Sequence, residues 1–510
     1  MDFENELTSK ILDPIHGTIR LTTLEIAFIN HPLFQRLRNI KQNSFLYKVF
    51  PSAVHSRFEH SLGVLHLSSE ILNNLRLNAI RYQKKYNDGH VFCYIDQIPK
   101  HNIQELRLAA LMHDIGHGPI SHQFDSFMPN KQELSDVLPK AFHSVINVLS
   151  KPDQKVEHEQ LSLLFSLMIY HDLKTQGKVD DEINIENVLK IIEKRYGDQQ
   201  IIEEINGKAT DILPLMTSII SSCPIDADRM DYLLRDGYFS GVKCGIYDYN
   251  RLFMSIVPVE EKGKLYLAYK ESGIDSIAEF IGARSSLFSQ VYYHKTNRAF
   301  ATMLSTLCEI MQSKDPQNVI ISDVTDRIVD HSDESFIDAL KEFYLACSDD
   351  YFLNEKVGEW IDTSDTEAVN KKILDDIINR HPWSKVYEAK HSVYKANIAD
   401  KENKAWKSQL TGLLTSVLQP HFKPHEFAID IVSDCAFKDL DKTEVKLLVK
   451  DLENRYEIKP LIQCGDKLNQ YQIIKYCIRV FVDRDIKERV TSEIIHKINQ
   501  IVIKQIALLN

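Results

Sequence analysis

The amino-acid sequence predicts a mainly α-helical protein with a smaller mixed α/β region towards its C-terminal end. Between Leu62 and Leu75, apolar residues recur every three or four positions, which is the spacing of one buried helix face. Residues 103–113 repeat that spacing. Strand-like segments at 427–432 and 471–482 lie near the C-terminal end. We therefore expect a helical core at about 1–315 and a helical and α/β region at 316–510.

Composition places the chain among ordinary globular proteins and excludes some partners. The 510 residues are 44% hydrophobic and 26% charged, with a formal net charge of -11. That charge disfavours broad adhesion to nucleic acid, so no nucleic-acid partner is expected, although a local basic pocket would still suit a phosphate-rich ligand. The eight cysteines form no C-x-x-C pair, and no signal core or membrane span is apparent. We expect a cytoplasmic protein without membrane contact.

The first third of the chain reads as a turn followed by helices. The turn signature Asp13-Pro14-Ile15-His16-Gly17 precedes a short strand at 18–21. Short helices are predicted at 24–29 and 32–40, and a long helix begins at about Arg57, which places His60 near its N-terminus. The helix at 103–113 ends at the turns around Gly116 and Gly118.

The rest of the core contains an insert and two further helices. Residues 126–200 are more polar and predict a flap of short helices and loops. An apolar helix is predicted at 209–222, and one amphipathic helix at about 274–312. A closing helix is expected at 486–507.

The densest group of chemically capable residues follows the helix at 103–113. His113, Asp114, His117 and His122 lie within ten residues. A bare His-Asp pair is usually a capped helix end, so a metal site needs distant partners. His60 and Asp228 are the best candidates. Two imidazoles with two carboxylates suit Mn, Fe, Zn or Mg, and such a cation promotes phosphoester hydrolysis.

Other histidines near this group are candidates for proton transfer. His117 and His158 can donate or accept a proton near neutral pH. Asp125 can hold one of these imidazoles in a productive tautomer. Alone, a histidine such as His122 is more often a surface or capping residue.

Five motifs over residues 10–300 resemble one family, the HD-domain deoxynucleoside triphosphate triphosphohydrolases. They are 13–17, 34–38, 57–64, 113–122 and 226–236, and they contain the H...HD...D pattern of His60, His113-Asp114 and Asp228. The resemblance implies that these four residues bind a divalent metal ion. It also implies that His117 and His158, supported by Asp125, transfer protons at the leaving oxygen.

The same resemblance implies a set of substrate-binding residues. In the relatives, these positions hold the triphosphate, contact the sugar or belong to the histidine motif. The matching residues here are Gln42, Arg57, His122, Arg229, Tyr232, Asp236, Arg284 and Tyr292. Arg229 stands where the relatives usually carry a lysine. The arginine keeps the positive charge and presents more hydrogen-bond donors over a wider group. Asn43 stands where the relatives carry a leucine that disfavours a 2′-hydroxyl, so ribonucleotides are not clearly excluded.

A regulatory nucleotide site of the relatives is matched only in part. Matching residues are Lys10, Arg38, His294 and Lys295. Asn30 and Leu12 replace an aspartate and an asparagine there. The resemblance therefore allows an activator nucleotide without specifying one.

Together these observations predict an enzyme that hydrolyses deoxynucleoside triphosphates to a deoxynucleoside and inorganic triphosphate. One alternative keeps the chemistry and changes the substrate to another nucleotide or phosphoester. Another is a nucleotide-sensing or nucleic-acid-binding scaffold with a structural metal. By analogy, we expect a homo-oligomer, a dimer or tetramer, with residues 316–510 in the subunit contacts.

Overall fold

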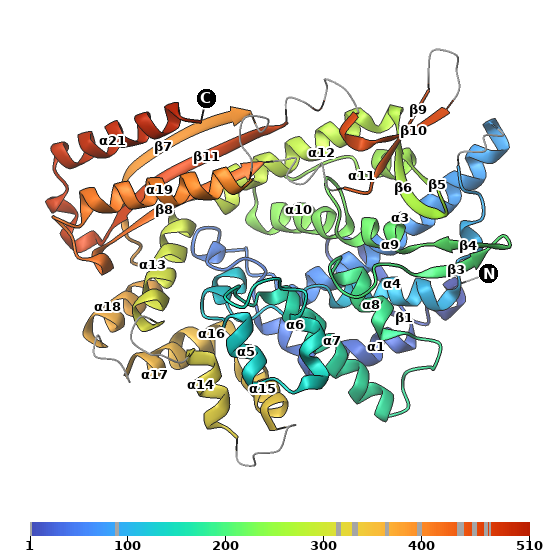
Figure 1. The fold of residues 1–510 in the computed structure, drawn as a ribbon, viewed down its shortest axis with the longest axis horizontal. Helices are drawn as coiled ribbons and strands as arrows, with labels where there is room; N and C mark the ends of the chain where they lie inside the picture. Colours follow the sequence, from blue (N-terminus) through green and yellow to red (C-terminus); the bar gives the residue numbers. More distant parts are fainter. Residues whose placement is uncertain are drawn as a thin grey trace.

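The fold is a helical body with a three-stranded sheet carried at one side (Figure 1). The computed structural model describes residues 3–86, 91–312, 318–328, 335–362, 367–394, 400–435, 443–450, 456–463, 468 and 471–509. Structural statements below concern these residues.

Helices make up most of the body, and each begins where a cap or an apolar stripe begins. The cap of helix α10 bears directly on the metal site, because the Asp226 side chain accepts from the Arg229 backbone N–H and fixes the first turn around Asp228. The helices up to residue 312 are α1 (Thr23–Ile29), α2 (Pro32–Gln35), α3 (Arg57–Tyr86), α4 (Lys100–Met112), α5 (Lys131–Val137), α6 (His143–Ile146), α7 (His158–Thr175), α8 (Ile185–Ile192), α9 (Leu213–Ile220), α10 (Ala227–Ser240), α11 (Tyr249–Ser255), α12 (Ile274–Leu287) and α13 (Lys295–Gln312).

Further helices follow residue 312; some pack on the helical body and others on the C-terminal sheet. Those nearest to the body are α14 (Val319–Asp326), α15 (Ser335–Ala346), α16 (Asp349–Tyr351), α17 (Val357–Asp362) and α18 (Glu367–Ile378). Two more, α19 (Asp400–Leu418) and α21 (Ser492–Ala507), lie against the C-terminal sheet (Figure 1).

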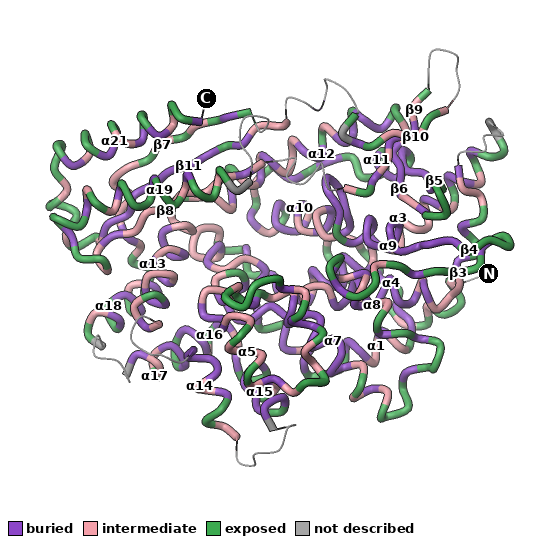
Figure 2. Tube along the Cα trace, viewed as in Figure 1, coloured by how far each residue is buried: buried purple, intermediate pink, exposed green. Residues whose placement is uncertain are grey.

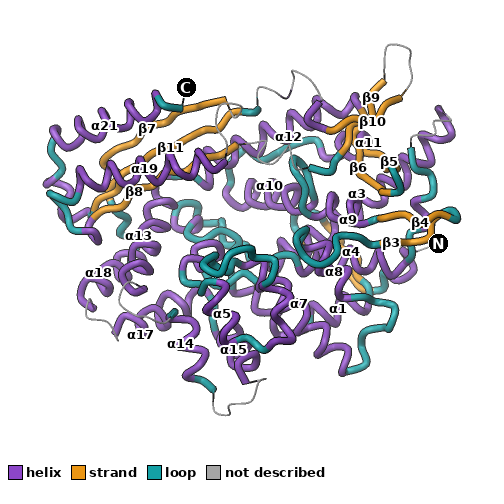
Figure 3. The backbone as a smooth tube through the Cα atoms, in the orientation of Figure 1, coloured by secondary structure: helices purple, strands orange, loops and turns teal. Residues whose placement is uncertain are grey.

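The strands form separate groups, which Figure 3 shows in orange. The hairpin of β1 (Ser9–Asp13) and β2 (Gly17–Leu21) is antiparallel. A mixed sheet has the order β10-β9-β6-β4-β3, with β5 paired to β6; its strands are β3 (Ile202–Ile205), β4 (Lys208–Asp211), β5 (Ile256–Glu261), β6 (Lys264–Lys270), β9 (Lys446–Lys450) and β10 (Tyr456–Pro460). The third sheet is antiparallel, in the order β7-β11-β8, from β7 (Ser384–Tyr394), β11 (Ile473–Val482) and β8 (Phe427–Cys435).

Two apolar cores hold these layers together. The larger one spans the helical body and continues past residue 315 through Phe343, Phe352 and Trp383 to Leu448. The smaller one lies between the third sheet and the helices α19 and α21, and it contains Trp406, Ile478 and Ile498. Figure 2 shows the buried parts of α3, α4, α7 and α9 at the centre of the body. The domain boundary at about 315 stays a prediction, and the larger core crosses it.

The mainly helical fold with a smaller mixed region at the C-terminal end is confirmed. The single helix expected at 274–312 is wrong: α12 runs into a π-helical turn, Phe288–Tyr292, and the chain reorients at Tyr293 and His294 before α13. The helix expected at 209–222 is shorter, because β4 takes up its first residues. Within 126–200, helix α7 is largely buried, since one of its faces packs into the body.

No described helix has the length and apolar character that crossing a membrane would require.

Candidate metal and phosphate site

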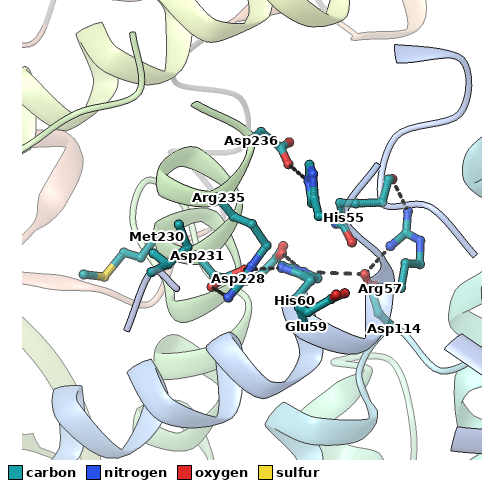
Figure 4. A network of polar contacts seen from close by, with 12 residues as sticks. His55, Arg57, Glu59, His60, Asp114, Asp228, Met230, Asp231, Arg235 and Asp236 are labelled. Carbon is teal, nitrogen blue, oxygen red and sulfur yellow. Dashed lines mark hydrogen bonds and ion pairs between the residues drawn. The ribbon is translucent and has the colours of Figure 1, made fainter. Parts of the chain in front are cut away.

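Three helix ends bring the predicted metal ligands together. His60 lies in the first turn of α3, His113 and Asp114 directly follow α4, and Asp228 lies in the first turn of α10. The Nε2 atoms of His60 and His113 lie 3.2 and 3.8 Å from Asp228 Oδ1. Each of these nitrogens lies 3.6 Å from an Asp114 carboxylate oxygen. The four side chains therefore converge on one point, and Figure 4 shows His60, Asp114 and Asp228 there.

The unpaired imidazole nitrogens indicate what belongs at this point. His60 Nδ1 lies 2.7 Å from Asp231 Oδ2, and His113 Nδ1 lies 2.9 Å from the Ala110 carbonyl oxygen. Both Nε2 atoms are buried without a hydrogen bond. Because each Nδ1 faces an acceptor, each Nε2 is free to present a lone pair, the arrangement that a metal-ligating histidine needs. The donor set fits a divalent cation, and a group of His60, His113 and Asp228 has the required spacing.

Charge around the point of convergence keeps the carboxylates ionised. Burial would raise the pKa of Asp114, but His113, Arg57 and His60 hold it well below its usual range. Burial would likewise raise the pKa of Asp228, and His113 and His60 lower it. Burial lowers the pKa of His60, yet the carboxylate of Asp228 next to Nε2 and the hydrogen bond to Asp231 raise it to about 10. Without a cation, the imidazoles carry the positive charge that the carboxylates attract.

Asp231 is the buried anion behind the site, and the sequence analysis did not single it out. It accepts from Arg235 Nε and Nη2, both at 2.9 Å, and its Oδ1 lies 2.7 Å from His16 Nε2. Arg235 Nη1 also donates to Asp13 Oδ2 at 2.8 Å. The turn that begins at Asp13 therefore supports His60 from behind. Asp231 and Arg235 are four residues apart, and this spacing in the sequence could have indicated their ion pair on one helix face (Figure 4).

The turn after α4 depends on a close approach at Gly116. A Cβ atom there would lie 2.1 Å from the His158 carbonyl oxygen and 2.3 Å from the Ser162 backbone nitrogen. Gly116 therefore lets the start of α7 pack against the turn that carries His117. Further along, Ile120 and Ser121 both have positive φ, 58° and 53°. This backbone holds Ser121 Oγ within 3.0 Å of Arg57 Nε.

The predicted proton-transfer residues form a second cluster beside the first. The rings of His117 and His158 stack with centroids 3.7 Å apart, and His122 lies edge-on to both. Asp125 Oδ2 lies 3.2 Å from His158 Nδ1. His117 Nε2 lies 3.6 Å from Asp114 Oδ1, so the two clusters adjoin. The spacing of His117, His122 and His158 would also allow a metal ion.

The stacked histidines differ in charge. Burial, Arg57 and His158 hold the pKa of His117 well below its usual value. Burial also lowers the pKa of His158, but the hydrogen bond to Asp125 and the charge of Glu159 raise it overall. Burial would raise the pKa of Asp125, whereas His122 and His158 lower it to about 2. Near neutral pH, His117 is therefore neutral, and His158 is the group disposed to carry a proton.

Arg57 is the predicted phosphate ligand closest to the metal ligands. Its side chain is buried, donates to Asp114, and reaches the Gln42 carbonyl oxygen at 3.3 Å. The Gln42 side-chain oxygen is itself buried without a partner, as is the Asn43 Nδ2 atom. These two neighbouring side chains have unused hydrogen-bonding capacity.

The other predicted substrate residues lie along α10 and α12, but several are already paired. Arg229 donates to Asp226. Arg284 Nη1 lies 3.1 Å from Asp434 Oδ1, which the sequence analysis did not identify. Tyr292 donates to Asp236, and Asp236 also lies 2.6 Å from His55 Nε2, another residue that was missed. Tyr232 faces Tyr292 at a centroid distance of 6.4 Å.

The predicted regulatory residues lie on two separate parts of the fold. Lys10 pairs with Arg20 across the β1–β2 hairpin, and Arg38 stacks over the Phe58 ring at 3.5 Å. His294 and Lys295 lie where α13 begins, and His294 is 6.0 Å from the Phe50 ring. Among the described residues, the structure records no direct contact between the two pairs.

Comparison with known proteins identifies the domain. Residues 57–236 match the family model described as the HD domain. An uncharacterized protein of Methanocaldococcus jannaschii is 30% identical over 345 residues, which cover 67% of this chain and 56% of that protein. Deoxynucleoside triphosphate triphosphohydrolase SAMHD1 of Danio rerio is 31% identical over 296 residues, 58% of this chain and 43% of that protein. The human protein of the same name is 29% identical over 322 residues, 58% of this chain and 44% of that protein.

The chain thus spans about half the length of the curated relatives it matches. A crystal structure of a hypothetical protein from Aquifex aeolicus superimposes with a TM-score of 0.60 at 21% identity, covering 96% of this chain and 99% of that one, and so shows the same fold. The matched HD domain begins and ends on two of the helices that converge on the metal ligands, α3 and α10. Residues 57–236 therefore match the HD domain, and the chain resembles deoxynucleoside triphosphate triphosphohydrolases in sequence.

Proposed function

We propose that the protein hydrolyses deoxynucleoside triphosphates to a deoxynucleoside and inorganic triphosphate. The observation that carries the proposal is the buried pair of unpaired Nε2 atoms on His60 and His113, which face two ionised carboxylates beside the His117–His158 stack. A structural metal site would not need a second, titratable cluster next to it. Hydrolysis needs both an electrophilic centre and a proton donor.

His60, His113, Asp114 and Asp228 would hold a divalent cation, for which Mn, Fe, Zn and Mg are the candidates. When bound, such a cation supplies a Lewis acid that neutralises phosphate charge and lowers the pKa of water.

His158 is the residue best suited to protonate the leaving group. Water adds to the α-phosphorus, the bond from phosphorus to the sugar 5′ oxygen breaks, and that oxygen takes up a proton. The raised pKa of His158 keeps a proton available near neutral pH, and Asp125 orients the ring. His117 stacks on His158 and, being neutral, can accept a proton from the attacking water.

Arg57 would hold the phosphate next to the metal ligands, and Arg229, Arg284 and Tyr232 would hold the remaining phosphates. Arg229 and Arg284 are each paired with a carboxylate, so substrate phosphate has to compete with Asp226 and Asp434. Gln42, Asp236 and Tyr292 would contact the sugar, and His122 would extend the histidine cluster towards the phosphates.

A ribonucleotide is the second candidate substrate, and one observation favours it. The buried Asn43 Nδ2 atom lacks a hydrogen-bond partner, next to the equally unpaired Gln42 Oε1. A buried donor or acceptor left without a partner costs free energy, which a hydroxyl of the ligand can recover. If they face the sugar, they would accommodate a 2′-hydroxyl.

A product assay with all four deoxynucleoside triphosphates and all four ribonucleoside triphosphates tests the proposal. Reactions contain Mg or Mn, with and without added nucleotides as activators, and products are separated by ion-exchange chromatography. Inorganic triphosphate released from deoxynucleotides supports the proposal, and equal release from ribonucleotides supports the second candidate. Cleavage of monophosphates or cyclic nucleotides alone would show that the substrate assignment is wrong.

An Asp228→Ala variant distinguishes an enzyme from a scaffold. An enzyme loses both bound metal and turnover. A nucleotide-sensing or nucleic-acid-binding scaffold loses bound metal but has no turnover to lose, so nucleotide release by the unaltered protein has to be measured first.

We also propose a homo-oligomer in the cytoplasm, with a nucleotide as a candidate activator. The partial match at Lys10, Arg38, His294 and Lys295 supports the activator proposal. Sedimentation of the full chain, with and without nucleotide, measures both properties, because an activator that bridges subunits shifts the assembly state.

A further inference from the structure

A cavity of about 290 Å³ lies between the end of α12 and the β7-β11-β8 sheet. Ser285, Phe288 and Tyr293 line it from the helical body, and Lys390, Lys475 and Arg479 line it from the sheet. Among the described residues, its lining includes none of the metal ligands or of the His117–His158 cluster. It is a separate space, next to the Arg284 side of the candidate site.

The sheet register explains why basic side chains gather here. Side chains alternate between the two faces of a strand, so Lys475, Cys477 and Arg479 of β11 share one face. Lys390 of β7 is opposite Cys477 and belongs to that face too. The opposite face, with Ile474 and Ile478, is buried under α19 and α21. The polar face is therefore the one that meets α12.

Positive charge in the cavity exceeds the negative charge that lines it. Arg479 is 3% exposed; its Nε donates to Glu388 at 2.8 Å and its Nη2 to the Tyr293 carbonyl oxygen at 2.8 Å. Its buried Nη1 makes no hydrogen bond and lies 3.6 Å from Asp430 Oδ2. Lys475 Nζ donates to a neutral partner, the Ser285 hydroxyl, at 2.7 Å.

Asp434 is the carboxylate in the cavity lining, and it is already engaged by Arg284. Because Arg479 faces Glu388 and Asp430, the excess positive charge of the lining comes from Lys390 and Lys475. In a protein with a net charge of -11, a pocket with this local excess of positive charge concentrates anions.

We propose that this cavity binds a phosphate-bearing anion of nucleotide size. Lysine and arginine donors make strong, charge-assisted hydrogen bonds to phosphate oxygens. The rings of Phe288 and Tyr293 offer flat apolar surfaces on which a base can stack. A free polyphosphate shares the phosphate chemistry and lacks the base, so the two sources can be told apart.

The cavity is connected to the candidate phosphate site through Arg284. Asp434 and Phe288 line the cavity, and both contact Arg284: Asp434 by the 3.1 Å ion pair, and Phe288 with the guanidinium 4.2 Å from its ring centroid. An anion next to Asp434 repels its carboxylate and so changes how strongly Asp434 competes for Arg284. This consequence rests on the proposed function, in which Arg284 holds substrate phosphate, and it predicts a change in KM rather than kcat.

Equilibrium dialysis with the full-length protein in EDTA tests the binding proposal without turnover. The probes are inorganic triphosphate, ATP and adenosine. To weaken binding at the other phosphate site, the measurement is made in an Arg57→Ala background. Lys390→Ala/Lys475→Ala is the test variant, and Lys497→Ala, on α21 away from the cavity, is the control. Thermal melting checks that each variant is folded.

Triphosphate or ATP should bind in the Arg57→Ala background. The double lysine variant should bind either probe at least about tenfold more weakly. Tighter binding of ATP than of triphosphate assigns a nucleotide, and equal binding assigns a polyphosphate. No binding of either, or binding that the double lysine variant retains in full, overturns the proposal. Because dialysis does not measure hydrolysis, its result is independent of whether the proposed activity is found.

Discussion

Replacing Asp231 with asparagine should weaken metal binding although Asp231 is not a metal ligand. Its carboxylate faces only donors: His60 Nδ1, His16 Nε2 and two Arg235 nitrogens. An asparagine amide of the same shape presents an N–H group to one of them. If that group faces His60 Nδ1, the ring proton moves to Nε2, and the atom that should bind the metal no longer has a free lone pair.

Asp231→Asn should lower both metal affinity and folding stability, and general magnitudes set the size of each loss. Loss of a carboxylate that orients a ligating histidine costs roughly 10–100-fold in metal affinity. Removing one member of a buried ion pair costs roughly 3–5 kcal/mol of folding stability. A natural domain has about 5–15 kcal/mol of stability, so Asp231→Asn is expected to remain folded with a lowered Tm.

Metal content and affinity of Asp231→Asn are measured by elemental analysis and by competition with a chelating dye. Circular dichroism establishes that the variant is folded. Asp181→Asn is the control, because the Asp181 side chain is fully exposed and pairs only with Lys174 at the surface. A folded Asp231→Asn protein that binds metal as tightly as the unaltered chain would refute the role assigned to Asp231.

Three further predictions concern the same site. Burial lowers the pKa of His158, but the hydrogen bond to Asp125 raises it overall, so activity should be retained near neutral pH and fall as the pH rises through that raised pKa. Asp125→Asn should move this fall to lower pH, and an unmoved alkaline limb of the pH–kcat profile would contradict the assignment. A Cβ atom at Gly63 would lie 1.9 Å from Asp231 Oδ1, so Gly63→Ala should lower the free energy of unfolding by about 1–3 kcal/mol and reduce metal content. Gly282→Ala is the control, because its Cβ meets only the Tyr471 hydroxyl, at 3.6 Å. Thermal melts and metal analysis should show neither change in the control. Removing metal with a chelator should abolish hydrolysis and lower Tm, and one metal ion per chain should restore both. If two metal ions bind per chain, the second is assigned to the His117–His122–His158 cluster, whose role is then metal binding instead of proton transfer.

Local patterns in the sequence were enough to predict two of the helices that carry the site, whereas α10, which carries Asp228, was not predicted. The three- and four-residue spacing after Arg57 and before His113 matches α3 and α4. The four metal ligands could be proposed because their residue types and motif contexts are distinctive. That they converge is a finding of the structure, and their metal-binding role stays a prediction.

Residues that act through distant partners could not be predicted in this way. Asp231 on an amphipathic helix reads as an ordinary solvated carboxylate, yet it contacts His60 across 171 residues of sequence. Asp434 and His55 are similar, because each acquires its meaning from a partner on another element, Arg284 or Asp236. The break at Tyr293 and His294 was missed although residues 284–295 are unusually polar for the middle of a buried helix.

The sequence by itself determined the helical class, the residue types at the site and the resemblance to an enzyme family, because these depend on spacing along the chain. Only the tertiary structure decided which histidine nitrogens lack partners, whether the pKa of His117 and of His158 is raised or lowered, and which face of the third sheet meets α12. Those properties depend on burial and on contacts between groups far apart in sequence, and such contacts form only when the helices and the sheet pack together.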